Sequence, residues 1–100
     1  MARSPQITSQ TLKVLEAVIS QPELSGAEVA RITRLATGTL YPILLRLEGA
    51  GWLQSHWEEG DPQVLGRPRR RFYSVTAEGA RAARNAAAEL QPMIGRLSWA

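Results

Sequence analysis

Hydrophobic positions in the first part of the chain recur at the three- and four-residue spacing of helices. The stretch from Ile7 to Ile19 carries one apolar stripe, which predicts a first helix. Thr8 or Ser9 is its expected cap, and Pro22 ends it because the residue before a proline avoids helical geometry. In Ser25-Gly26-Ala27-Glu28, a serine followed three residues later by a glutamate predicts a capping box that opens a short second helix.

A third helix is predicted from Thr37 to the Gly49-Ala50-Gly51 segment, with one apolar and one exposed face. Pro42 is tolerated because it lies in the first turn or just past it, where few backbone N–H groups have partners. The face expected in the core consists of Leu40, Ile43, Leu44 and Leu47. The face expected outside consists of Thr37, Thr39, Tyr41, Leu45, Arg46 and Glu48.

The pattern changes to alternation in the second half of the chain. Trp52 to Trp57 is predicted to be a strand, Glu58 to Pro68 a loop and Arg69 to Val75 the returning strand, which together make a hairpin with a long tip. Thr76 is expected to cap a final helix that runs toward the C-terminus. Pro92 is expected to bend or end that helix, leaving the last residues as a separate short turn.

This order of elements predicts a mainly α protein with a small β-hairpin (α+β), in the form of a winged helix-turn-helix with a C-terminal dimerisation helix. Residues 1–75 are expected to form the DNA-binding domain and residues 76–100 the dimerisation helix. In such a fold the second and third helices are the DNA-reading pair, and the hairpin is the wing.

The last helix carries a heptad seam with spacings of 3, 4, 3, 4 and 3 residues. Alanines at its start allow two helices to approach closely, and larger side chains follow. The seam favours dimerisation, with packing against the chain's own first helix as the alternative. Its residues are Ala80, Ala83, Ala87, Leu90, Ile94 and Leu97.

Composition narrows the chemistry further. The chain has 100 residues, no cysteine and one histidine, which excludes disulfides, thiolate zinc sites and a thiol nucleophile. No apolar run is long enough to span a bilayer, and no export signal opens the chain, so a cytoplasmic protein is expected. No combination of residues predicts an enzyme, a cofactor site or a metal site.

The net charge of +3 is unevenly distributed. Residues 1–61 have five basic and seven acidic side chains, whereas residues 62–100 have seven basic and two acidic ones. The densest basic segment is Arg67 to Arg71, where Arg67 is expected at the loop tip and Arg69 and Arg70 on opposite sides of the strand. Arginines in a wing can contact the DNA backbone or enter the minor groove. The alternative is that these charges only protect the exposed edge of the hairpin from pairing with another strand.

Several segments together resemble the PadR family of transcriptional regulators. In the third helix and just after it these are Thr39-Leu40-Tyr41-Pro42, Leu44-Leu45-Arg46-Leu47-Glu48 and Gly51-Trp52-Leu53. In the wing and the start of the last helix they are Gly66-Arg67-Pro68-Arg69-Arg70 and Phe72 to Gly79. The resemblance implies a homodimeric repressor that binds a palindromic operator in double-stranded DNA. Members of the family often regulate detoxification, efflux or phenolic-acid stress genes. Leu45 departs from the family, in which a polar or aromatic residue is usual at this position.

The start of the third helix and the wing therefore hold the predicted DNA-binding residues. Thr37, Thr39 and Tyr41 offer hydroxyl groups to base edges, and Gly38 permits close approach of the backbone to a phosphate. The full predicted set is Thr37, Gly38, Thr39, Tyr41, Arg46, Arg67, Arg69 and Arg70. For Arg46, pairing with Glu28 or with a partner near Glu48 is the alternative to a phosphate contact.

Two other kinds of partner are considered: a small-molecule effector and an acidic protein. Some members of the family bind a drug through an aromatic residue in the middle of the last helix, but Ala86 to Leu90 contains none, so an effector pocket would have to use Trp52 or Trp99. The alternative function, from another class, is a winged-helix interaction module whose arginines bind an acidic protein partner.

Overall fold

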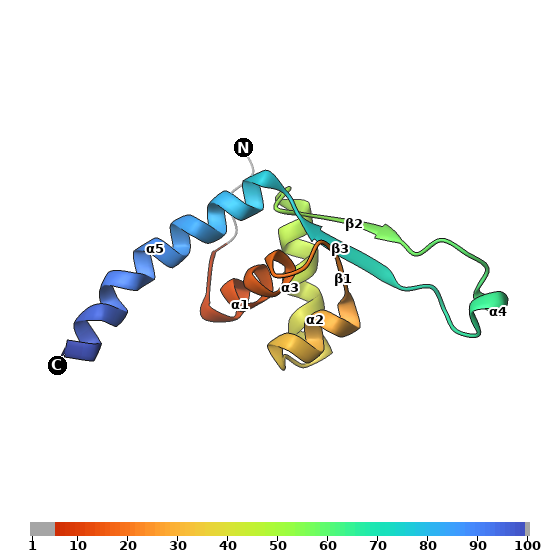
Figure 1. Ribbon diagram of the computed structural model, residues 1–100, viewed down its shortest axis with the longest axis horizontal. Coiled ribbons are helices and arrows are strands. Elements are labelled where there is room, and N and C mark those ends of the chain that lie inside the picture. The colour runs from red at the N-terminus through yellow and green to blue at the C-terminus, as the bar shows by residue number, and fades with distance from the viewer. Residues whose placement is uncertain (1–5, 100) are drawn as a thin grey trace.

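The structure, a computed structural model, describes residues 6–99, with side chains as far as Glu89. Within this range the elements follow in the order α1 Ser9–Ile19, β1 Leu24–Ser25, α2 Gly26–Thr33, α3 Thr37–Gly49, β2 Leu53–Trp57, α4 Pro62–Leu65, β3 Arg71–Val75 and α5 Ala77–Trp99. Figure 1 shows that the β2–β3 hairpin and α5 project to opposite sides of a body formed by α1, α2 and α3. The predicted mainly α architecture with a β-hairpin is confirmed.

The helix starts follow from their capping residues. The Thr8 side chain accepts a hydrogen bond from the Thr11 N–H at 3.2 Å, so α1 begins at Ser9 rather than at Ile7. The predicted capping box of α2 is present: the Glu28 N–H donates to Ser25 Oγ at 3.2 Å, and the Ser25 N–H donates to Glu28 Oε1 at 3.0 Å. Both bonds satisfy backbone donors that the first turn leaves free.

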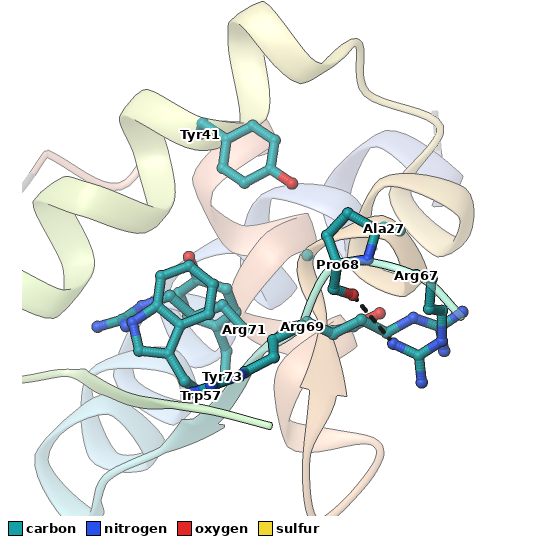
Figure 2. A pocket seen from close by; sticks show the side chains of 11 residues that line it. Ala27, Tyr41, Trp57, Arg67, Pro68, Arg69, Arg71 and Tyr73 are labelled. Atoms are coloured by element: carbon teal, nitrogen blue, oxygen red, sulfur yellow. Dashed lines mark hydrogen bonds between the residues drawn. The ribbon is translucent and has the colours of Figure 1, made fainter. Parts of the chain in front are cut away.

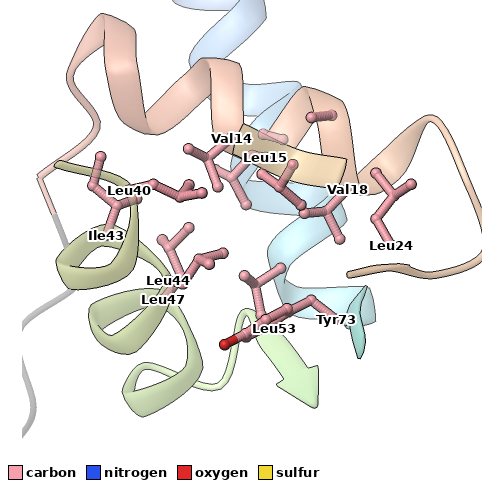
Figure 3. Close-up of a cluster of buried hydrophobic side chains, with 13 residues drawn as sticks. Val14, Leu15, Val18, Leu24, Leu40, Ile43, Leu44, Leu47, Leu53 and Tyr73 are labelled. Atoms are coloured by element: carbon pink, nitrogen blue, oxygen red, sulfur yellow. The ribbon is translucent and has the colours of Figure 1, made fainter. Parts of the chain in front are cut away.

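The apolar faces of the helices meet in one core, shown in Figure 3. The four residues predicted for the core face of α3 are all at most 3% exposed. Leu53 of β2 and Tyr73 of β3 extend the same cluster, so the wing is packed onto the helical body at its base. Burying one face of α3 fixes its opposite face at the surface.

The hairpin is part of a three-stranded antiparallel sheet with the order β1-β3-β2. Leu24 pairs with Tyr73 and Ser25 with Phe72, an additional strand that the sequence pattern did not predict. Two residues are too few to show alternation. The returning strand also begins at Arg71, two residues later than predicted, because regular pairing with β2 ends opposite Trp57.

The sequence pattern predicts an irregular loop at the wing tip, but the structure has the one-turn helix α4 there. Asp61 caps it by accepting a hydrogen bond from the Gln63 N–H at 2.9 Å, and Pro62 occupies its first turn. Gly66 ends it in the left-handed conformation with φ of 72°, which glycine adopts without strain. A helix of four residues is too short to produce a hydrophobic period.

The predicted cap of α5 is confirmed. Thr76 Oγ1 accepts a hydrogen bond from the Gly79 N–H at 3.1 Å and donates to the Gly51 carbonyl at 2.6 Å, which ties α5 to the turn after α3. The prediction that Pro92 separates a terminal turn is wrong, because the helical backbone continues to Trp99. A single proline removes one backbone hydrogen bond, and the turns on either side of it remain helical.

Candidate nucleic-acid interface

The first turn of α3 is exposed and has no side-chain cap. Ala36 occupies the N-cap position, so no side-chain oxygen binds the N–H groups at this helix end. Thr37 and Gly38 are exposed, and Thr39 is half-buried. A Cβ atom added at Gly38 would meet nothing within 4 Å. A helix start with small side chains and uncapped N–H groups suits the close approach of a phosphate or a base edge.

The exposed surface continues along α3 to Arg46. Tyr41 is 46% exposed and Leu45 is 72% exposed, and Arg46 also lies at the surface. Among the described residues no carboxylate forms an ion pair with Arg46, because Glu28 belongs to the capping box of α2 and Glu48 pairs with the wing. The alternative in which Arg46 is neutralised by an acidic neighbour is therefore not seen.

A carboxylate–guanidinium clamp closes the base of the wing tip. Arg67 Nη1 and Nη2 donate to Glu58 Oε1 and Oε2 at 2.6 and 2.9 Å. Beside this pair the Glu58 N–H donates to the Arg70 carbonyl at 2.7 Å, and the Arg70 N–H donates to Glu58 Oε1 at 3.3 Å. The prediction that Arg67 lies at the loop tip is wrong: α4 forms the tip, and Arg67 lies between α4 and β3.

The clamp gives the wing a measurable response to acid. Hydrogen bonds from the Arg67 guanidinium and the Arg70 N–H lower the pKa of Glu58 from 4.5 to about 2. A carboxyl group with a lowered pKa stabilises the fold fully above its unfolded pKa, and this contribution is lost as the pH falls toward the folded value. We therefore expect the Glu58 carboxyl resonance to titrate near pH 2 by NMR.

The Arg67 guanidinium resonances should change with the same midpoint near pH 2, because Arg67 is bound to the titrating carboxylate. The Glu58→Gln variant should show no such step, whereas Glu59→Gln, which changes the adjacent exposed residue, should retain it. A Glu58 midpoint near 4.5 would mean that the clamp does not form in solution.

A second set of contacts joins the wing to α3. The Arg71 guanidinium carbon lies 4.9 Å from the ring centroid of Trp57, and Arg71 Nη2 lies 3.6 Å from Glu48 Oε2. The Ser55 hydroxyl donates to the same carboxylate. The sequence pattern did not mark Glu48 and Trp57 as functional, because their contacts depend on the register that places Trp57 opposite Arg71. These contacts hold the wing at a defined position beside the C-terminal half of α3.

A groove of about 440 Å³ lies between the start of α2, α3 and the wing, as Figure 2 shows. Within the described part of the chain, Arg69 and Arg70 form no ion pair, so their charges are available in the same groove that Tyr41 lines. Guanidinium groups of this kind suit phosphate oxygens. Of the predicted DNA-binding residues the groove brings together Tyr41, Arg67, Arg69 and Arg70, whereas Thr37, Gly38, Thr39 and Arg46 lie outside its lining.

The structure describes the side chains of three of the six predicted dimerisation residues. Ala83 is 5% exposed and belongs to the core of its own chain, so the alternative of packing within the chain holds at this position. Ala80 and Ala87 are half-buried. The side chains of Leu90, Ile94 and Leu97 lie outside the described residues. Figure 1 shows the C-terminal part of α5 extending away from the helical body.

Other predicted chemistry has a limited structural basis. Trp52 packs against the core and does not line the groove beside the wing. It also does not line a second, smaller groove, which lies between α1 and the end of α2. The Trp99 side chain lies outside the described residues. An effector pocket therefore stays a prediction. Among the residues that the structure describes, no group of histidine and acidic side chains could hold a metal ion. No helix in that range is long and apolar enough to cross a membrane.

Comparison with known proteins adds independent findings. The model of the transcriptional regulator PadR-like family matches residues 17–85. No protein of curated function matches the chain. The fold is similar to a PadR family transcriptional regulator from Eggerthella lenta DSM 2243, with a TM-score of 0.75 and 24% identity over 90% of this chain and 79% of that one.

Two further solved structures share the fold. A PadR family transcription regulator from Clostridium difficile R20291 has a TM-score of 0.77 and 22% identity, over 92% of this chain and 97% of that one. The protein smu.1704 from Streptococcus mutans UA159 has a TM-score of 0.70 and 26% identity, over 84% of this chain and 77% of that one. Because the family match covers more than half of its length, the chain belongs to the PadR-like family of DNA-binding transcriptional regulators.

Proposed function

We propose that this chain is a homodimeric repressor that binds a palindromic operator through the start of α3 and the arginines of the wing. The observation that carries the proposal is that Tyr41 of α3 and the exposed Arg69 and Arg70 of the wing line one groove. A helix in the major groove and a basic hairpin beside it are the two contacts that a winged helix-turn-helix makes with DNA.

The proposed DNA-binding residues divide into those that contact base edges and those that contact the DNA backbone. Thr37, Thr39 and Tyr41 lie where a recognition helix presents side chains to base edges, and the open backbone of Gly38 suits a phosphate. Arg46 is exposed farther along the same helix, where it would contact a phosphate. Arg69 and Arg70 supply the wing's contact with the backbone or the minor groove, and Arg67 supports them through its clamp with Glu58.

The proposed dimer forms through residues 76–100, with residues 1–75 as the DNA-binding domain. The heptad seam supports this division, as does the extension of α5 beyond the body. Two-fold symmetry then requires half-sites about one helical turn apart, ~34 Å. Sedimentation equilibrium of the full chain should give twice the monomer mass, and footprinting should show two protected half-sites. A monomer that protects a single half-site would contradict this arrangement.

A gel-shift series with the DNA upstream of the protein's own gene tests the function directly. We expect retardation that is selective against random DNA of the same length and that weakens as salt rises. Transcription in vitro from the retarded promoter should fall when the protein is added. Unselective binding or none would contradict the proposal, and binding to an acidic protein would then support the interaction-module alternative.

Tyr41→Ala should weaken binding to the preferred site about tenfold, because one good base-edge contact contributes roughly 1–3 kcal/mol of discrimination. Binding to random DNA should change by less than about twofold, since that binding depends on phosphate contacts. Competition gel shifts on both DNAs give the ratio of the affinity for the preferred site to the affinity for random DNA. Tyr41 is 46% exposed and lies outside the core cluster, so the variant should stay folded, with a melting temperature close to that of the wild type. Equal losses on both DNAs would assign Tyr41 to the backbone.

A further inference from the structure

The ring of Tyr41 lies directly on the backbone at the start of α2. A Cβ atom added at Gly26 would lie 2.8 Å from Tyr41 Oη, 3.2 Å from Cε1 and 3.3 Å from Cζ. The first distance is shorter than real Cβ contacts, so any side chain at position 26 must displace the tyrosine. Gly26 is buried and Tyr41 is half-exposed, which means that the ring covers the glycine while part of it stays accessible.

The backbone conformation does not explain a glycine at this position. The glycines with positive φ among the described residues are Gly51, Gly60 and Gly66, whereas Gly26 has the ordinary geometry of a first helical residue. The three atoms nearest to its added Cβ all belong to Tyr41. The space at Gly26 is therefore filled by the hydroxyl end of one surface side chain, not by the core.

The Tyr41 hydroxyl faces a groove that Gly26 also lines (Figure 2). Gly26 and Tyr41 both line the groove that contains Arg69 and Arg70, and Figure 2 shows the Tyr41 hydroxyl directed into that groove. None of the other α3 residues predicted to bind DNA lines it. A shift of the ring away from α2 would move the hydroxyl relative to the wing arginines while leaving the course of α3 unchanged.

We propose that Gly26 is a positioning residue for sequence recognition, whose missing side chain allows Tyr41 to present its hydroxyl in the groove between α2, α3 and the wing. The inference rests on the proposed function of α3 and the wing in DNA binding. Gly26 acts through Tyr41, so it controls selectivity between DNA sequences more than total affinity.

The test is Gly26→Ala in the full-length protein. Alanine suits a helix better than glycine, and the obstructing atoms are the far end of a movable side chain, so the melting temperature should stay equal or rise. Affinity for the preferred site should fall about tenfold, similar to the loss expected for Tyr41→Ala, with little change on random DNA. The matched control is Gly49→Ala on α3, where an added Cβ meets nothing within 4 Å; neither affinity should change.

A double variant separates an effect through Tyr41 from any other. In the Tyr41→Ala background, Gly26→Ala should cause no further loss of selectivity, because the obstructed ring is absent. Equal losses in both backgrounds, or equal losses on preferred and random DNA, would overturn the proposal and indicate that Gly26 itself approaches the DNA backbone.

An NMR measurement on the free protein distinguishes failure of this inference from failure of the proposed function. The wild type should show a nuclear Overhauser effect between the Gly26 Hα atoms and the Tyr41 ring, and Gly26→Ala should move the ring resonances. Absence of that contact would overturn the positioning role even if the wild type binds DNA selectively. If the contact is present but the wild type does not select among DNA sequences, the proposed function itself is wrong, and the role in recognition is wrong with it.

Discussion

Replacing both Arg69 and Arg70 by alanine is expected to weaken DNA binding by about 100-fold at physiological salt, or roughly tenfold for each charged hydrogen bond lost. These two arginines of the wing are exposed, and within the described residues neither forms an ion pair. Their charges are therefore free to replace counterions on the phosphate backbone. The wing is packed through Leu53 and Tyr73, which the substitutions do not touch.

Salt dependence gives this expectation a second, sharper readout. Each phosphate contact contributes about 0.9 to the slope of log affinity against log salt, so losing two contacts should lower the slope by about 1.8. The loss should be similar on preferred and random DNA, in contrast to the selective loss expected for Tyr41→Ala. Fluorescence anisotropy titrations at several salt concentrations on both DNAs measure the salt slope and the ratio of the two affinities together.

A matched control removes the same charge elsewhere. Arg81 and Arg84 are exposed on α5, outside the groove, and replacing both by alanine changes the net charge equally. This control should leave the salt slope within about 0.3 of the wild type if the slope counts contacts and not total charge. An unchanged slope for the Arg69 and Arg70 variant, or an equal decrease in the control, would show that the wing does not contact the backbone.

The core face of α3 could be predicted residue by residue because a helix of 13 residues repeats its apolar spacing several times. Leu40, Ile43, Leu44 and Leu47 each confirm the same orientation, and they also define which face is outside. The strand β1, with two residues, and the helix α4, with four, repeat no pattern. β1 exists because Leu24 and Ser25 pair with β3, a partner almost fifty residues away in the sequence.

The location of the candidate site could likewise be predicted, but not the different roles of its arginines. The sequence presents Arg67, Arg69, Arg70 and Arg71 as one basic cluster. In the structure Arg67 is bound by Glu58 and Arg71 by Glu48. Both pairings require the hairpin to close with one particular register, which composition and spacing do not determine. The contact between Gly26 and Tyr41 similarly requires the angle between α2 and α3.

The largest expected loss of stability comes from Gly79→Ala. Gly79 lies in the first turn of α5, and a Cβ atom there would be 2.1 Å from the Trp52 carbonyl oxygen and 3.0 Å from Val75 Cγ2. The obstructing atom belongs to the backbone. Hydrogen bonds hold the start of α5 to the turn between α3 and β2: the Thr76 N–H donates to that same carbonyl at 3.0 Å, and Thr76 Oγ1 donates to the Gly51 carbonyl at 2.6 Å. No side-chain rotation relieves the overlap, so α5 must move away from the turn between α3 and β2.

We expect the free energy of unfolding to fall by about 3 kcal/mol and the melting temperature by roughly 10–20 °C. The sign of the change in unfolding free energy is informative. Alanine is favoured over glycine within a helix by about 1 kcal/mol, so it would stabilise α5 if space were available. Gly49→Ala, with nothing within 4 Å of its added Cβ, should therefore be neutral or stabilising. Thermal unfolding must be compared at equal chain concentration, since dimerisation would make the melting temperature concentration-dependent. A Gly79→Ala variant as stable as Gly49→Ala would mean that α5 does not approach Trp52 this closely, and the hydrogen bonds of Thr76 would then not fix where α5 leaves the body.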